Sequence, residues 1–190
     1  MRCLIISDIH GSAAALAQVL SINPPENFDH LLVLGDLLNH GARNHLPEGY
    51  DPMQVVELLN EHANRIMAVR GNCDGEVDGM LFNFPCNGPY LYLIDPILKE
   101  RRVLITHGHL FEVKSPEGAA KAGLKRGDIV LSGHTHSAGV TEYQSGVINV
   151  NPGSISLPRG GKEPSYGIFD DSGFKIIGLK TGTVMAELKL

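Results

Sequence analysis

Short apolar runs alternate with helical patterns through the first seventy residues of the chain. Three runs of four consecutive apolar residues predict buried strands, and two segments between them carry the spacing of helices. The predicted strands span 2–7, 30–35 and 65–71, and the predicted helices span 12–22 and 52–63. Ser12, at the start of the first helix, is a favoured N-cap residue. The order β-α-β-α-β predicts a parallel sheet with right-handed crossover connections.

The rest of the chain consists mainly of short strands separated by turns. Further strands are predicted at 90–95, 101–108, 128–134, 139–144, 146–154, 166–171, 174–182 and 183–190. Segment 115–123 is predicted as a short helix, and the loop at 37–50 is long for a plain connection. Parallel strands first and mostly antiparallel strands later predict an α/β fold of two packed sheets with helices outside. The length of 190 residues fits one domain, residues 1–190.

Composition and charge exclude several classes of protein. Hydrophobic residues make up 43% and charged residues 19%, which is typical of a globular protein, and no apolar run approaches the roughly 18 residues of a membrane span. The opening MRCLIISD reaches Asp8 too early for a signal peptide, so we expect a cytoplasmic protein. The formal net charge of −5 argues against nucleic-acid binding through bulk electrostatics. Three cysteines without a C-x-x-C pair argue against a disulfide framework or a zinc knuckle.

Polar residues follow five of the apolar runs at the point where each run ends. The segments are SDIHG (7–11), GDLL (35–38), GNCD (71–74), THGH (106–109) and GHTH (133–136). Each segment alone is weak evidence, because Asp, Asn and Gly are common in turns. The carboxyl ends of strands in an α/β sheet meet at one rim, where ligands bind. Five such segments in order therefore predict one site.

The side chains at these strand ends suit two divalent metal ions. Seven of them supply carboxylate, amide or imidazole donors: Asp8, His10, Asp36, Asn72, His107, His134 and His136. Mixed oxygen and nitrogen donors favour Mn, Fe, Zn or Ni over Mg or Ca. Two ions about 3.5–4 Å apart can polarise a phosphoryl group and activate water near neutral pH. Because the Asn donor is neutral, net positive charge remains for an anionic substrate.

The order D-x-H, GD, GN, H, GH-x-H resembles that of the calcineurin-like metallophosphoesterase superfamily. GDLLNHGARNHLPEGYDP, RGNCDGEVD, ITHGH and NVNPGSISLPRG narrow the resemblance to the small bacterial YfcE-type phosphodiesterase group, over nearly the whole chain. The resemblance implies a four-layer α-β-β-α fold, in which a two-sheet β-sandwich is flanked by helices. It also implies a hydrolase that acts on phosphoric ester bonds, with a small phosphodiester as substrate.

The resemblance also assigns roles to the seven donors. It places the first ion on Asp8, His10, Asp36 and His136, and the second on Asp36, Asn72, His107 and His134. Asp36 then bridges both ions, of which Mn²⁺ is the preferred identity. A metal-bridging hydroxide would attack the phosphorus atom in line, without a covalent enzyme intermediate.

RGNCDG (70–75) departs from the pattern of many superfamily members, which carry His directly after the metal-binding Asn. Cys73 stands at that position here. A thiol of pKa about 8.5 is a poor proton donor to an alkoxide, so we expect substrates with good leaving groups. A Cys nucleophile with a phosphate cradle needs Arg six positions on, where this chain has Gly79. Cys73 is therefore either an active-site contact or an inert thiol.

Other candidate residues keep a structural alternative. Arg43 in the long loop is a candidate for binding substrate phosphate, against a solvated-loop role. His109 either faces the substrate or is structural. Asp74 and Asp78 either orient ligand imidazoles or are structural, and NPGS (151–154) is primarily a turn.

Two other functions remain open from the sequence alone. One is a phosphomonoesterase such as a nucleotide phosphatase. The other is a non-catalytic scaffold, as in the phosphoesterase-like subunit of the retromer complex, although a scaffold has no need of seven metal donors. Homo-oligomer formation is also open.

Overall fold

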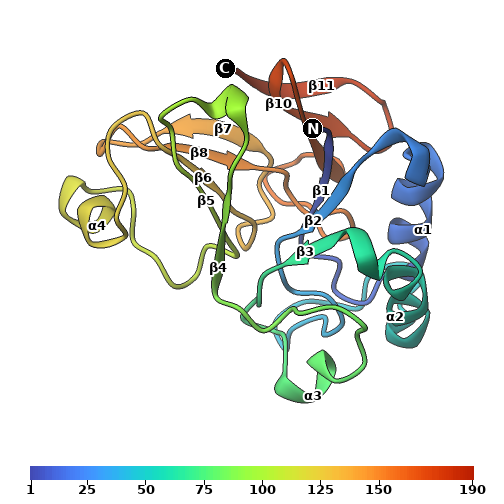
Figure 1. Ribbon diagram of the computed structural model, residues 1–190. Helices are drawn as coiled ribbons and strands as arrows, with labels where there is room; N and C mark the ends of the chain where they lie inside the picture. The colour runs from blue at the N-terminus through green and yellow to red at the C-terminus, as the bar shows by residue number, and fades with distance from the viewer.

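Two β-sheets form the centre of the computed structural model, which describes residues 1–190 (Figure 1). The first sheet has six strands in the spatial order β11-β10-β9-β1-β2-β3. Their bounds are β1 Cys3–Ile6, β2 His30–Val33, β3 Ile66–Ala68, β9 Ser165–Asp170, β10 Gly173–Gly178 and β11 Val184–Lys189. As predicted, β1, β2 and β3 are parallel, while β9 joins β1 on its other side in the antiparallel direction.

The second sheet has five strands in the spatial order β4-β5-β6-β8-β7. Their bounds are β4 Tyr90–Leu93, β5 Val103–Thr106, β6 Ile129–Leu131, β7 Gly139–Glu142 and β8 Ile148–Asn151. In this sheet β5, β6 and β8 run parallel, whereas β4 and β7 are antiparallel to their neighbours. Most pairings of the second half of the chain are antiparallel, as predicted. The long connection between the parallel strands β5 and β6 contains α4, and β7 is an edge strand of the sheet.

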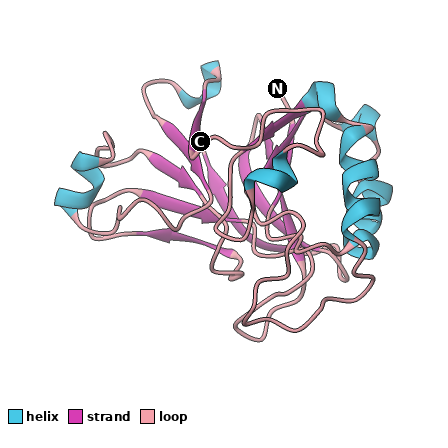
Figure 2. Cartoon of the chain, turned by 90° about the horizontal axis from the view of Figure 1, so that it is seen from below, coloured by secondary structure: helices cyan, strands magenta, loops and turns pink.

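Helices cover the outer faces of both sheets, so the strands lie between two helical layers (Figure 2). On the first sheet lie α1 (Ala13–Ile22) and α2 (Pro52–Asn60), and over the second lies α4 (Pro116–Lys121). Shorter turns are α3 (Glu76–Gly79) and the 3₁₀ segments Pro25–Asn27, Ala63–Arg65 and Pro96–Leu98. Ser12 caps α1 by accepting the backbone N–H of Ala15. None of these helices combines the length and apolarity needed to cross a lipid bilayer.

The alternation of side chains along β1 shows how the layers are held together. Leu4 and Ile6 face the helices, in a cluster of 23 buried residues. Cys3 and Ile5 face the other sheet, in a cluster of 16. Successive side chains of a strand point to opposite faces, so a continuous apolar run serves two cores at once. The buried strands thereby fix the position of the loops that follow them.

Candidate metal centre

The polar segments that follow the strands come together at one end of the two sheets. From the first sheet come the residues after β1, β2 and β3, and from the second sheet those after β5 and β6. Asp8, His10, Asp36, His107 and His136 are all buried, with at most 3% of each residue exposed. Buried charged and polar side chains need partners, so this cluster calls for a specific explanation.

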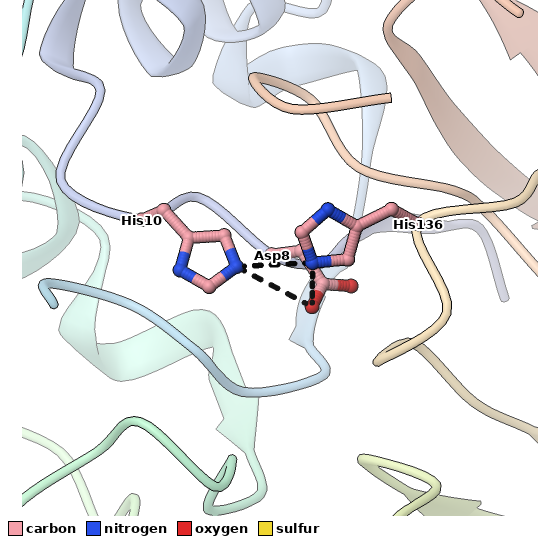
Figure 3. Close-up of side chains that lie close together, drawn as sticks. All are labelled: Asp8, His10 and His136. Carbon is pink, nitrogen blue, oxygen red and sulfur yellow. Dashed lines mark hydrogen bonds and ion pairs between the residues drawn. The ribbon is translucent and has the colours of Figure 1, made fainter. Parts of the chain in front are cut away.

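Asp8, His10 and His136 form the first group of donors (Figure 3). The Nε2 atoms of His10 and His136 lie 3.1 Å apart. Both atoms face the same carboxylate oxygen, Oδ1 of Asp8, at 3.8 Å for His10 and 3.3 Å for His136. Three donors from two different sheets therefore point at one small volume.

Asp36 stands between this group and a second one. Its Oδ2 lies 3.7 Å from Nε2 of His10 and 3.4 Å from Nε2 of His107. His107 Nε2 in turn lies 3.1 Å from the side-chain oxygen of Asn72. The ring of His134 stacks edge-on to that of His107, with 5.1 Å between centroids. The fold thus brings all seven predicted donors together, with Asp36 in contact with both groups.

Backbone carbonyls set the orientation of three of the imidazoles. The Nδ1 atoms of His10, His107 and His136 lie 2.6–2.7 Å from the carbonyl oxygens of Asn39, Leu34 and Leu157. A carbonyl only accepts, so each Nδ1 carries a proton, and Nε2 is the nitrogen that is free to bind a metal ion once any second proton has left the ring. The alternative in which Asp74 and Asp78 orient imidazoles is wrong.

Asp74 instead holds the backbone around Asp36. Its carboxylate accepts the N–H groups of Asp36, Leu37 and Gly71, at 2.7–2.8 Å. Asp78 accepts the N–H of Gly75. Asp74 therefore fixes the turn after β2 against the turn after β3.

An unpartnered carboxylate oxygen in the site shows that the donor set fits a divalent cation. Oδ1 of Asp8 is buried and has no hydrogen-bond partner, whereas Oδ2 accepts from Ser7 and from the backbone of His134. If both rings are neutral with the proton on Nδ1, the Nε2 lone pairs of His10 and His136 face each other at 3.1 Å. An orphaned carboxylate oxygen and two opposed lone pairs are stabilised by positive charge between them.

The ionisation of Asp36 and His107 shows how strongly the cluster attracts positive charge. Burial alone would lower the pKa of His107, but the hydrogen bond to Asp36 and the charges of Asp8 and Asp36 raise this pKa to about 9. Burial alone would raise the pKa of Asp36, but His107 lowers it to about 2. The carboxylates that hold a proton on His107 would equally hold a metal cation.

The backbone is unusual where these donors lie. Six non-glycine residues have positive φ, and five of them are predicted ligands, with φ between 50° and 65°: Asp8, His10, Asp36, His134 and His136. Such conformations cost roughly 1–3 kcal/mol each and are retained where surrounding contacts impose them. The NPGS segment, predicted as a turn, supplies such contacts. Ser154 Oγ donates to the carbonyl of Asp8 at 2.7 Å and accepts the N–H of Leu157.

A polar cavity of about 410 Å³ opens over the cluster. Arg43 lines it, as the sequence suggested, and so do three residues that the motifs did not single out: Asn44, Thr135 and Arg159. Arg159 lies in the NVNPGSISLPRG segment that carries the family resemblance, and this is the signal that could have found it. His109 does not line this cavity. Its ring lies 5.3 Å from that of His107 and 6.0 Å from that of His134.

Cys73 forms part of the wall of the cavity. Its Sγ lies within 4.8 Å of donor atoms of His10 and Asp36, and its backbone N–H donates to Asp36 Oδ1. Burial first, and then the negative charge of Asp36, raises the pKa of the Cys73 thiol to about 12. The thiol is therefore protonated at neutral pH, which disfavours a role as thiolate nucleophile.

Comparison with known proteins identifies the family of this chain. The family model described as "Calcineurin-like phosphoesterase superfamily domain" matches residues 1–172 of the chain. The chain belongs to this superfamily. Its relatives include Phosphodiesterase YfcE of Escherichia coli strain K12, which is 42% identical over 190 residues, 100% of this chain and 98% of that protein.

Solved structures of similar proteins share the fold described here. The structure of the E. coli phosphoesterase YfcE superposes with a TM-score of 0.87 at 41% identity, over 100% of this chain and 99% of that one. Chaetomium thermophilum Vps29 superposes with a TM-score of 0.64 at 17% identity, over 97% of this chain and 93% of that one. The second likeness concerns the fold alone. The α-β-β-α architecture predicted from the sequence is confirmed.

Proposed function

We propose that this superfamily member is a dinuclear-metal phosphodiesterase, with a single catalytic domain of residues 1–190 and a small phosphodiester as substrate. The observation that carries the proposal is the cluster of Asp8, His10, Asp36, His107 and His136 around the orphaned Asp8 oxygen, with Asn72 and His134 beside His107. The relationship to Phosphodiesterase YfcE over the whole chain supports it. A scaffold would have no need to keep so costly a buried cluster.

The proposed ligand sets follow the two groups of donors. Asp8, His10, Asp36 and His136 would hold one divalent ion, and Asp36, Asn72, His107 and His134 would hold the other. Mn²⁺ is the proposed ion, with Zn²⁺, iron or Ni²⁺ as alternatives, because the donors mix carboxylate, amide and imidazole. When bound, the ions would supply positive charge at the phosphoryl oxygens and activate water for attack.

The residues of the chain supply orientation, and they offer no strong acid. The carbonyls of Asn39, Leu34 and Leu157 hold three imidazoles with Nε2 toward the centre. Asn72 is neutral, so it leaves more positive charge for an anionic substrate. Cys73 occupies the wall where a leaving-group acid could stand, and a thiol S–H is a weak hydrogen-bond donor. Esters of acidic alcohols are therefore the expected substrates.

The proposed location is the cytoplasm. Cys3, Cys73 and Cys86 are all free thiols, which is the usual state of cysteine in a reducing compartment. Oligomeric state stays open.

The experiment is hydrolysis of bis(p-nitrophenyl) phosphate by protein loaded with Mn²⁺, compared with p-nitrophenyl phosphate. A diester turned over with a higher kcat/KM than the monoester supports the proposal. The runner-up, a phosphomonoesterase, is favoured by the two arginines in the cavity, which suit a dianion. A monoester preference would replace the proposal with that activity, and no hydrolysis of either ester by fully loaded protein would favour the scaffold.

A further inference from the structure

Two arginines in the cavity have no acidic partner. Arg43 and Arg159 both line it, and neither forms a salt bridge within the chain. Both are exposed at the surface of the cavity. An unpaired guanidinium that faces a cavity beside a catalytic centre is suited to bind a carboxylate or phosphate group.

Arg159 is tied to the donor cluster by its own backbone. Its N–H donates to the carbonyl of His136 at 3.0 Å, while His136 Nδ1 donates to the carbonyl of Leu157. The guanidinium of Arg159 donates to the side-chain oxygen of Asn44 at 3.2 Å. Asn44 follows Arg43 in the long loop, so this bond brings the two arginine-bearing segments together. Both the backbone and the guanidinium of Arg159 are therefore held by contacts within the chain.

The cavity offers little to an apolar substituent. Apart from Ala42 and the Cys73 thiol, its lining consists of glycine and polar or charged residues: His10, Asp36, Gly41, Arg43, Asn44, Asn72, His134, Thr135, His136 and Arg159. No Phe, Tyr or Trp is among them, so a nucleobase or aryl group has no carbocyclic ring on which to stack. A small polar substituent fits this wall best.

A second, less polar cavity adjoins the first. It has a volume of about 430 Å³ and shares His134 and Thr135 with the first cavity, while Phe111, Val130 and Tyr143 are among its lining residues. A phosphodiester has two substituents. Two unlike cavities that meet at His134 suit one apolar leaving group and one polar group that stays on the phosphate.

We propose that Arg43 and Arg159 form an anion subsite that selects phosphodiesters whose retained substituent carries a second negative charge, as a carboxylate or a phosphate. The inference rests on the proposed phosphodiesterase function and names its substrate class. The single charge of a diester lies on the reacting phosphoryl group, at the donor cluster. The two guanidinium groups on the wall therefore match a further anion on the same substrate.

The test compares substrates that share one leaving group. p-Nitrophenyl propyl phosphate is neutral beyond the phosphoryl group, whereas the 2-carboxyethyl and 2-phosphonoethyl analogues add a carboxylate or a phosphonate. We expect kcat/KM to be about tenfold higher or more for at least one anionic analogue, since hydrogen bonds to charged groups are strong. The larger gain identifies which anion the subsite prefers.

Variants assign the preference to the arginines. Arg43→Met and Arg159→Met keep an unbranched apolar side chain and remove its charge. The ratio of kcat/KM between the anionic and the neutral analogue should therefore fall toward one, mainly through a change in KM. Arg159→Lys should retain part of the preference. Arg126→Met is the matched control, because Arg126 is exposed, pairs with Glu142 and lies outside the cavity. Its preference should equal that of the wild type.

A binding measurement keeps the test independent of turnover. Calorimetry with Mn²⁺-loaded protein should show that 2-carboxyethylphosphonate or ethylene-1,2-diphosphonate binds more tightly than propylphosphonate, and that either Met variant reduces the difference. Equal binding and equal kcat/KM for all analogues would overturn the subsite while hydrolysis of bis(p-nitrophenyl) phosphate still upheld the phosphodiesterase. Equal losses on every substrate in the Met variants would also overturn it, because the arginines would then bind the reacting phosphoryl group. Failure to hydrolyse any diester would instead contradict the proposed phosphodiesterase function. The phosphonate titration would still test whether the two arginines bind a second anion.

Discussion

Two single residues, Asp36 and Cys73, have the largest influence on the expected chemistry of this site. Asp36 contacts both groups of donors, and Cys73 stands in the cavity wall where many superfamily members carry His. A thiol S–H is a weak hydrogen-bond donor. We therefore expect the site to rely on its donor cluster for rate and on the substrate for an easy departure of the leaving group.

Restoring an imidazole at position 73 should help poor leaving groups most. A positioned general acid contributes about 10²–10⁴-fold, and one placed by substitution should contribute less, about tenfold. Cys73→His is expected to raise kcat/KM on esters with alkoxide leaving groups, such as nucleoside phosphates, and to change aryl diesters little. Cys73→Ala should cost little on aryl diesters. A large loss in Cys73→Ala at full metal content would mean that the thiol itself takes part in catalysis.

Removing a predicted ligand should abolish hydrolysis and leave the fold intact. Asp36→Ala and Asn72→Ala are each expected to lower kcat on bis(p-nitrophenyl) phosphate by more than about 10²-fold, since even partners of ligands matter by 10–100-fold. Both residues lie beyond the strand ends and outside the apolar clusters. Circular dichroism checks the fold. Near wild-type turnover in both variants would refute the ligand assignment.

At the scale of elements, the loops after the strands are held in strained shapes by other loops. Five predicted ligands have positive φ, although none of them is glycine. Ser154 links two of these loops, because its hydroxyl donates to the carbonyl of Asp8 and accepts from Leu157, whose carbonyl orients His136. The segment from β8 to β9 is thus a brace for the donor cluster.

Ser154→Ala should loosen this brace. The carbonyl of Asp8 would keep only the weaker bond from Ser156, at 3.1 Å. We expect about tenfold weaker metal binding, by analogy with other residues that support ligands, and a fall in stability of about 1 kcal/mol. Ser145→Ala is the control, since Ser145 Oγ donates to the carbonyl of Val113 and contacts no predicted ligand. The measurement is calorimetric titration with Mn²⁺. Equal affinity for Mn²⁺ in the two variants would contradict the proposed supporting role of Ser154.

The sequence predicted elements and donors well and their supporting contacts poorly. Apolar runs and turn residues located every strand, and order along the chain located the donors at strand ends. The parallel pairing of β5, β6 and β8 was missed, because alternation of apolar residues is silent about direction. The contacts of Asp74 with backbone N–H groups and of Ser154 with Asp8 join distant segments, which no local pattern encodes. Arg159 lies in a segment that carries the family resemblance, but contacts with His136 and Asn44 set its place in the cavity wall.

At the scale of the whole molecule, the donor cluster joins the two sheets. Asp8, His10 and Asp36 come from the first sheet and His107, His134 and His136 from the second. Nε2 of His10 and Nε2 of His136 meet across 126 residues of chain. Ions held by both sets would cross-link the sheets and stabilise the folded state in proportion to their affinity.

The protein should bind about two transition-metal ions per chain, counted by elemental analysis after dialysis. Added Mn²⁺ should raise the melting temperature, and a chelator should lower it and abolish hydrolysis. Asp36→Ala provides the matched control, with a smaller shift on addition of Mn²⁺. Full activity in a rigorously metal-free sample would end the proposed mechanism.

The position of β9 beside β1 has a consequence for synthesis on the ribosome. β1 lies in the interior of its sheet, but one neighbour, β9, begins only at Ser165. A nascent chain that has emerged only as far as β3 can pair β1 with β2, and it leaves the other edge of the apolar strand Cys3–Ile6 without a partner. Unpaired apolar edges promote aggregation. Fragments that stop before Ser165 should therefore accumulate as insoluble protein, and productive folding should wait for the last strands to leave the tunnel.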